Sequence, residues 1–127
     1  METLFDGAHA FGLARARIKI EAGDALGAET LLRDLAARYP DDERVWAMQG
    51  QLLAEQGRNE DALSSYREAT RFAPADPAPH VALARLLHAI NRDREALDEC
   101  RLARAVAPND PGTAALMREI EHGLAPR

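Results

Sequence analysis

Three polar side chains, His88, Glu119 and His122, have the types and spacing that could bind a metal ion. The two histidines occupy equivalent positions of a sequence repeat, and Glu119 with His122 forms a Glu-x-x-His pair, which di-iron helix bundles use in duplicate. Only one copy of this pair is present, and companion glutamates are not evident. The sequence also has no His-Glu-x-x-His motif, glycine-rich phosphate loop or Gly-x-Ser-x-Gly motif. We therefore expect no catalytic residue, no metal and no cofactor.

Composition and charge argue against several other classes of protein. Cys100 is the only cysteine, which excludes a disulfide framework, and its apolar helical surroundings predict a buried thiol. The formal net charge of −5 disfavours a nucleic-acid partner or an anionic membrane surface. No stretch approaches the roughly 18 apolar residues of a membrane-spanning helix. The N-terminus lacks a signal-peptide pattern, so we expect a cytoplasmic protein without membrane insertion.

Small and apolar residues recur with a period of about 34 residues, which is typical of helical repeat proteins. Ala, Leu, Arg and Glu dominate the composition, and all are strong helix formers, so the predicted fold is all-α. The recurring positions are Pro40, Pro74 and Pro108; Ala28, Ala62 and Ala96; Gly23, Gly57 and Asn91; Ala16, Gly50 and Ala84; and Ile18, Leu52 and Leu86. The pattern predicts about seven helices, near residues 7–22, 25–38, 43–56, 59–72, 77–90, 93–106 and 111–123.

Turn residues at the helix ends divide the chain into units. Gly23 is predicted to end the first helix in the left-handed conformation, and Asp41 or Asp42, Asn59, Asp76 and Asp93 are predicted N-caps. The units are a lead-in at residues 1–8, repeats at 9–42, 43–76 and 77–110, a capping helix at 111–123 and a tail at 124–127.

The two ends of the array are expected to differ from its middle. Lys19 stands where the second and third repeats carry Leu53 and Leu87, and Arg15 stands where the third carries Leu83, so the outer face of the first repeat can be charged. In the last helix Arg118 and Glu121 replace packing residues, while Leu116, Met117, Ile120 and Leu124 can cover the third repeat. This pattern predicts a solubilising cap.

The stretch from Glu43 to Asp76 resembles a tetratricopeptide repeat. Its Trp46, Gly50, Leu53, Ala62, Tyr66, Ala69 and Pro74 match the signature of that family, and weaker copies flank it on both sides. In the flanking copies the matching residues are Ala16, Ala28, Pro40, Leu83, Ala84, Leu87, Ala96, Ala103 and Pro108. The resemblance implies a right-handed superhelical α-solenoid of antiparallel helix pairs. It also implies a non-enzymatic scaffold or adaptor that binds other proteins.

The resemblance further implies that the first helix of each pair lines a concave groove. The predicted partner-binding residues are Leu13, Arg17, Arg44, Met48, Gln51, Glu55, Val81, Arg85 and His88. Arginines among apolar residues suit a protein or peptide segment with carboxylates and apolar anchors. Chaperone-binding family members clamp a C-terminal carboxylate with a lysine and asparagines. The matching positions here carry Leu13, Arg17 and Met48, so we expect that clamp to be absent.

Two alternatives to groove binding remain open at this point. Leu4, Phe5, an imperfectly capped end or the final helix could mediate assembly of a homo-oligomer. The segment could instead be a regulatory or targeting module of a larger multidomain or secretion-type protein. Its composition is shared by many bacterial repeat proteins and does not identify a partner.

Overall fold

Seven helices follow one another in the computed structural model, which describes residues 2–124 and side chains from residue 10 onward. They are α1 (Glu2–Glu21), α2 (Ala25–Arg38), α3 (Glu43–Glu55), α4 (Asn59–Phe72), α5 (Pro77–Ala89), α6 (Asp93–Val106) and α7 (Pro111–Leu124). No strand occurs within residues 2–124, and the predicted all-α fold is confirmed. The side chains of Leu4 and Phe5, and residues 125–127 of the predicted tail, lie outside the described residues.

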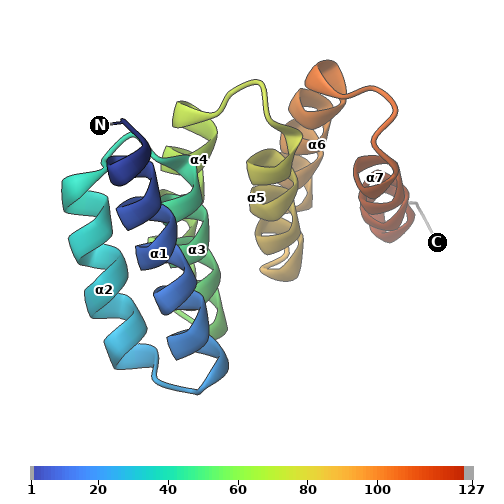
Figure 1. Ribbon diagram of the computed structural model, residues 1–127. Coiled ribbons are helices and arrows are strands. Elements are labelled where there is room, and N and C mark those ends of the chain that lie inside the picture. The colour runs from blue at the N-terminus through green and yellow to red at the C-terminus, as the bar shows by residue number, and fades with distance from the viewer. Residues whose placement is uncertain (1, 125–127) are drawn as a thin grey trace.

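The helices stack as three antiparallel pairs followed by a single helix (Figure 1). Within the pairs, α1 packs on α2, α3 on α4, and α5 on α6. Each pair meets the next through its second helix, because α2 packs on α3, α4 on α5, and α6 on α7. The first helices α1, α3 and α5 also contact one another in turn. This arrangement is an α-solenoid, in which each repeat is stabilised by its neighbours.

A residue with a positive φ angle lies in the turn between the two helices of each pair, as predicted for Gly23. Gly23, Gly57 and Asn91 follow the first helices with φ angles of 79°, 76° and 65°. These angles lie in the left-handed region, which glycine adopts freely and asparagine tolerates. Asn91 therefore replaces glycine without changing the turn.

Two of the predicted N-caps are confirmed and two are not. Asp42 and Asp76 accept hydrogen bonds from the backbone amides two residues ahead, at 2.9 and 3.0 Å. Asn59 and Asp93, predicted as caps, are instead the first helical residues of α4 and α6. The cap positions belong to Arg58 and Arg92, whose side chains make no capping hydrogen bond. A guanidinium has no acceptor atom, and both arginines bind acidic side chains instead.

The first helix starts earlier than predicted. α1 begins at Glu2 rather than near residue 7, so the predicted lead-in at residues 1–8 is helical from Glu2 onward. The lead-in contains no proline and only one glycine, Gly7, so it has no strong helix breaker.

Two groups of buried side chains form the core, and α3 belongs to both. The N-terminal cluster consists of Leu13, Ala16, Ala28, Leu32, Leu35, Ala36, Val45 and Leu52. The C-terminal cluster extends from Leu53 through α4, α5 and α6 to Ile120 of α7. Because Val45 and Leu52 face one cluster and Leu53 the other, α3 joins the two halves of the solenoid.

The two helices of the second repeat approach each other closely at Gly50. A Cβ atom at Gly50 would lie 2.9 Å from Cδ1 of Tyr66, closer than real contacts allow. Trp46 donates a hydrogen bond from Nε1 to the carbonyl oxygen of Pro40 at 2.8 Å and packs against the N-terminal cluster. Trp46 thus connects the second repeat to the preceding one.

Candidate protein-binding groove

An open cavity of about 570 Å³ lies along the first helices of the three pairs. Its walls come from α1, α3 and the start of α5, and its floor includes one residue of α4. The lining residues are Ala10, Leu13, Ala14, Arg17, Glu43, Arg44, Ala47, Met48, Gln51, Tyr66, Asp76, Ala78, Pro79 and Ala82. Five of these are alanines, whose short side chains keep the space between the helices open.

Tyr66 forms part of the cavity although it belongs to a second helix. Its side chain is only 8% exposed and packs in the C-terminal cluster. Gly50 opposite has no side chain, which gives the ring room beside α3. Burial raises the pKa of the Tyr66 hydroxyl, and the Glu55 carboxylate adds to the rise. The phenol is therefore neutral at ordinary pH and offers an aromatic surface with one hydroxyl.

The sequence analysis gave Tyr66 only as a signature residue and not among the predicted binding residues. A signal was present in the sequence. Gly50 is the smallest residue at the recurring position of Ala16, Gly50 and Ala84, and Tyr66 is the bulkiest at the facing position of Leu32, Tyr66 and Cys100. Such a pairing leaves the large ring in contact with the space that a side chain on the first helix would otherwise fill.

The charged lining residues differ in how firmly they are held. Arg44 donates from Nε and Nη2 to the two carboxylate oxygens of Asp42, at 3.2 and 3.0 Å. This bidentate pair fixes the guanidinium at the start of α3. Arg17 is exposed, and no described side chain forms an ion pair with it. Arg17 is thus the cation of the lining that is available to a carboxylate.

Five of the nine predicted binding residues line the cavity: Leu13, Arg17, Arg44, Met48 and Gln51. Leu13 is also part of the core, with 7% of its surface exposed. That these residues bind a partner stays a prediction.

The other four predicted binding residues lie outside the cavity lining. Val81 is 8% exposed and belongs to the C-terminal cluster. Glu55 accepts a hydrogen bond from Nε2 of Gln51 at 3.4 Å, one turn beyond the cavity. Arg85 lies exposed near Asp110, whose pKa is lowered by hydrogen bonds from Thr113 and further by Arg85. His88 lies on α5 beyond Ala82, which is the last residue of that helix to line the cavity.

His88 belongs to a polar contact between the third repeat and the last helix. Its Nδ1 lies 2.7 Å from Oδ1 of Asp93, and its Nε2 lies 3.8 Å from Oε1 of Glu119. Among the side chains of residues 10–124, no group of three or more His, Cys, Asp or Glu residues is placed to hold a metal ion. Cys100 is buried as predicted, and burial raises the pKa of its thiol.

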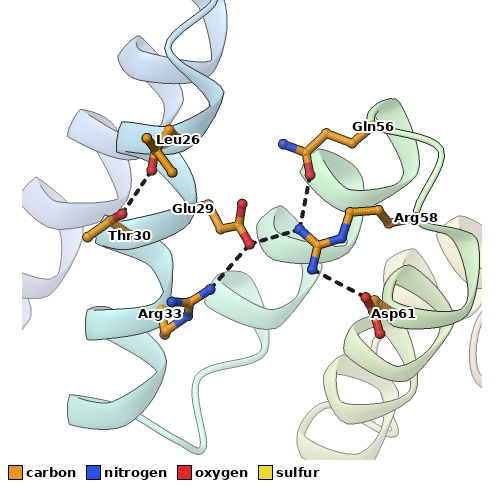
Figure 2. A network of polar contacts seen from close by, with 7 residues as sticks. All are labelled: Leu26, Glu29, Thr30, Arg33, Gln56, Arg58 and Asp61. Atoms are coloured by element: carbon orange, nitrogen blue, oxygen red, sulfur yellow. Dashed lines mark hydrogen bonds and ion pairs between the residues drawn. The ribbon is translucent and has the colours of Figure 1, made fainter.

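Polar contacts link successive repeats, and Figure 2 shows those around Arg58. Nη1 of Arg58 donates to Glu29 of α2 at 2.9 Å, while Nη2 donates to Asp61 at 3.3 Å. The next repeat repeats the contact, since Arg92 pairs with Glu95 and reaches back to Glu60 of α4 at 3.3 Å. The sequence analysis missed this network, although the two arginines occupy equivalent positions of successive repeats.

No helix among the described residues is long and apolar enough to cross a lipid bilayer.

Family models of known proteins match most of the chain. Two models, both described as tetratricopeptide repeat, match residues 13–77 and 53–120. No curated protein sequence matches the chain.

Three solved structures illustrate the similarity of fold. The type III secretion translocator chaperone SycD of Yersinia enterocolitica, in an alternative dimer, has a TM-score of 0.84 at 17% identity over 94% of this chain and 96% of SycD. The same chaperone with a peptide of the translocator YopD has a TM-score of 0.80 at 17% identity, covering 98% and 97%. The first tetratricopeptide repeat domain of Spaghetti, bound to an HSP90 peptide, has a TM-score of 0.82 at 13% identity. The match covers 93% of this chain and 94% of that domain.

Proposed function

The chain belongs to the tetratricopeptide repeat family, and from this premise we propose that it is a protein-interaction module that binds a partner segment in the groove. The observation that carries the proposal is the open cavity along α1, α3 and α5, with Tyr66 in its floor. The role is that of a non-enzymatic scaffold or adaptor. The cytoplasmic location and the bacterial origin expected from the sequence stay predictions.

The lining indicates the chemistry of the segment. Alanines with Met48 and Tyr66 provide an apolar surface that fits one bulky apolar side chain. Arg17 at the edge suits a carboxylate next to that anchor. SycD with its YopD peptide and Spaghetti with its HSP90 peptide support the class of ligand, since both are similar in fold and hold peptides.

A homo-oligomeric platform is the second candidate. It is favoured by one observation, namely that SycD, which is similar in fold, has been seen as a dimer. Membership in a larger multidomain or secretion-type protein is the third candidate expected from the sequence.

Blocking the cavity tests the proposed function. Peptides selected on the immobilised chain from a random-peptide display library are measured by fluorescence anisotropy against the wild type and Ala47→Trp. The indole would fill part of the cavity, so we expect the peptide affinity to fall by about tenfold or more. Ala37→Trp, on the exposed face of α2, is the matched control and should bind as the wild type does. Equal binding by both variants would place the peptide site elsewhere.

A further inference from the structure

The outer face of α1 exposes two large apolar side chains. Phe11 and Ile18 are 66% and 63% exposed. The equivalent positions of the next repeat, Val45 and Leu52 of α3, are 0% and 3% exposed and lie in the N-terminal cluster with leucines of α2. In α3 these positions therefore pack under the second helix of the preceding repeat. In α1 the same positions keep large apolar side chains that no part of the described chain covers.

Two cations lie on the same face of α1. Arg15 and Lys19 occupy the positions that correspond to Leu83 and Leu87 of α5, both 1% exposed. Arg15 is exposed without an ion-pair partner among the described side chains. Lys19 reaches only Asp24, at 3.5 Å, and remains about one third exposed. The face thus combines two large apolar side chains, at positions that are buried in the next repeat, with two positive charges.

We propose that this outer face of α1, formed by Phe11, Arg15, Ile18 and Lys19, docks an acidic amphipathic helix of a partner protein. The helix takes the place of the second helix of a preceding repeat, as α2 does for α3. Its apolar side chains pack on Phe11 and Ile18, and its carboxylates lie opposite Arg15 and Lys19. The site is separate from the groove and does not depend on it.

Charge selects this occupant over a second copy of the chain. A two-fold antiparallel pairing of two α1 helices would place Phe11 of each copy against Ile18 of the other. Arg15 lies between these residues in the sequence, so it would meet its own counterpart near the two-fold axis. Like charges brought together and desolvated oppose such a contact. A carboxylate-bearing helix makes the same apolar contacts without this repulsion.

The helix that covers α3 supplies a natural probe. Two labelled, hydrocarbon-stapled peptides carry the α2 sequence Ala25–Arg38 with its apolar residues unchanged. In the acidic peptide Arg33→Glu and Arg38→Glu leave only carboxylates, and in the basic peptide Glu29→Lys and Asp34→Lys leave only cations. We expect the full chain to bind the acidic peptide about tenfold more tightly than the basic one, and less tightly as salt rises.

Variants of the outer face of α1 test whether the acidic peptide binds there. The pair Phe11→Ser with Ile18→Ser should abolish binding, and the pair Arg15→Glu with Lys19→Glu should reverse the preference toward the basic peptide. Ala47→Trp, which blocks the groove, should leave this binding unchanged, which separates the two sites. Equal affinity for both peptides, or a preference that charge reversal leaves intact, would overturn the proposal. A dimer in sedimentation velocity that Phe11→Ser with Ile18→Ser dissociates would overturn it in favour of a second copy.

Discussion

Side-chain volume at two facing positions controls the packing of each repeat. In the second repeat Gly50 faces Tyr66, whereas the equivalent residues of the first repeat are Ala16 and Leu32, both fully buried. A smaller residue on the first helix thus accompanies a larger one on the second. Because protein interiors are close-packed, neither position can be changed alone without a clash or a void.

Gly50→Ala should destabilise the chain by about 1 kcal/mol or more, because its Cβ would lie 2.9 Å from the Tyr66 ring. This loss opposes the gain in helix propensity that alanine brings. Tyr66→Leu alone should also destabilise, because it leaves a void. Urea denaturation of the wild type, both single variants and the double variant measures the coupling.

The double variant recreates the Ala–Leu pair of the first repeat. It should be more stable than the sum of the single changes predicts, by about 0.5–3 kcal/mol. Strictly additive free energies of unfolding would show that the two side chains do not constrain each other.

At the scale of helices, the residue before each second helix either caps that helix or binds a carboxylate of the preceding repeat. Asp24 caps α2 by accepting a hydrogen bond from the amide of Gly27 at 2.9 Å. The equivalent residues Arg58 and Arg92 give no cap but bind carboxylates of the preceding repeat. The first pair has no described helix before it, so an aspartate there can stabilise its own helix end.

Arg58→Ala should lower the melting temperature by removing the contact between α4's start and Glu29 of α2. Arg101→Ala is the matched control, because Arg101 is exposed to a similar extent and pairs with Asp98 inside the same helix. We expect the larger decrease for Arg58→Ala at low salt. The difference should shrink at about 1 M NaCl, where the Debye length is about 3 Å. Equal melting temperatures of the two variants at low salt would show that the contact between Arg58 and Glu29 adds no stability.

At the scale of the whole molecule, the solenoid is expected to lose structure from the affected end rather than all at once. Its C-terminal cluster reaches Ile120, which is fully buried, through contacts of α7 with α5 and α6. The N-terminal cluster shares no buried residue with α7.

Ile120→Ala should destabilise α7 and the third repeat by about 2–5 kcal/mol, because it removes buried methyl groups. Hydrogen–deuterium exchange should then rise in α5, α6 and α7 while α1 and α2 keep their protection. Leu124→Ala, at a side chain that is 45% exposed, is the control and should leave exchange near the wild-type rate. A uniform rise over all seven helices would indicate that the chain unfolds as one cooperative unit.

Most helix boundaries could be predicted because each has a local signal. The bounds of α2, α4 and α6 agree with the prediction, and those of α3, α5 and α7 differ by a single residue. Gly23, Gly57 and Asn91 are detectable because a left-handed turn restricts residue type. The predicted caps at Asn59 and Asp93 were wrong, because α4 and α6 begin at these residues and the cap positions belong to Arg58 and Arg92. Local patterns do not reveal that these arginines bind residues of another repeat.

The candidate groove could be predicted only in part. The resemblance implied a groove along the first helices, helical periodicity then chose the faces of α1 and α3, and five predicted residues line the cavity. Periodicity does not show how far neighbouring helices stand apart, so it did not place the end of the cavity at Ala82 or the burial of Val81.

The sequence by itself determined the repeat length, the helix order and the family, because each depends on residues at fixed spacing along one chain. Only the tertiary structure decided that Tyr66 faces the groove, that Arg58 and Arg92 link repeats, and that Phe11 and Ile18 stay uncovered. These features depend on which surface lies against which across separate helices. Such contacts are set by the stacking of whole repeats, and one-dimensional patterns do not contain them.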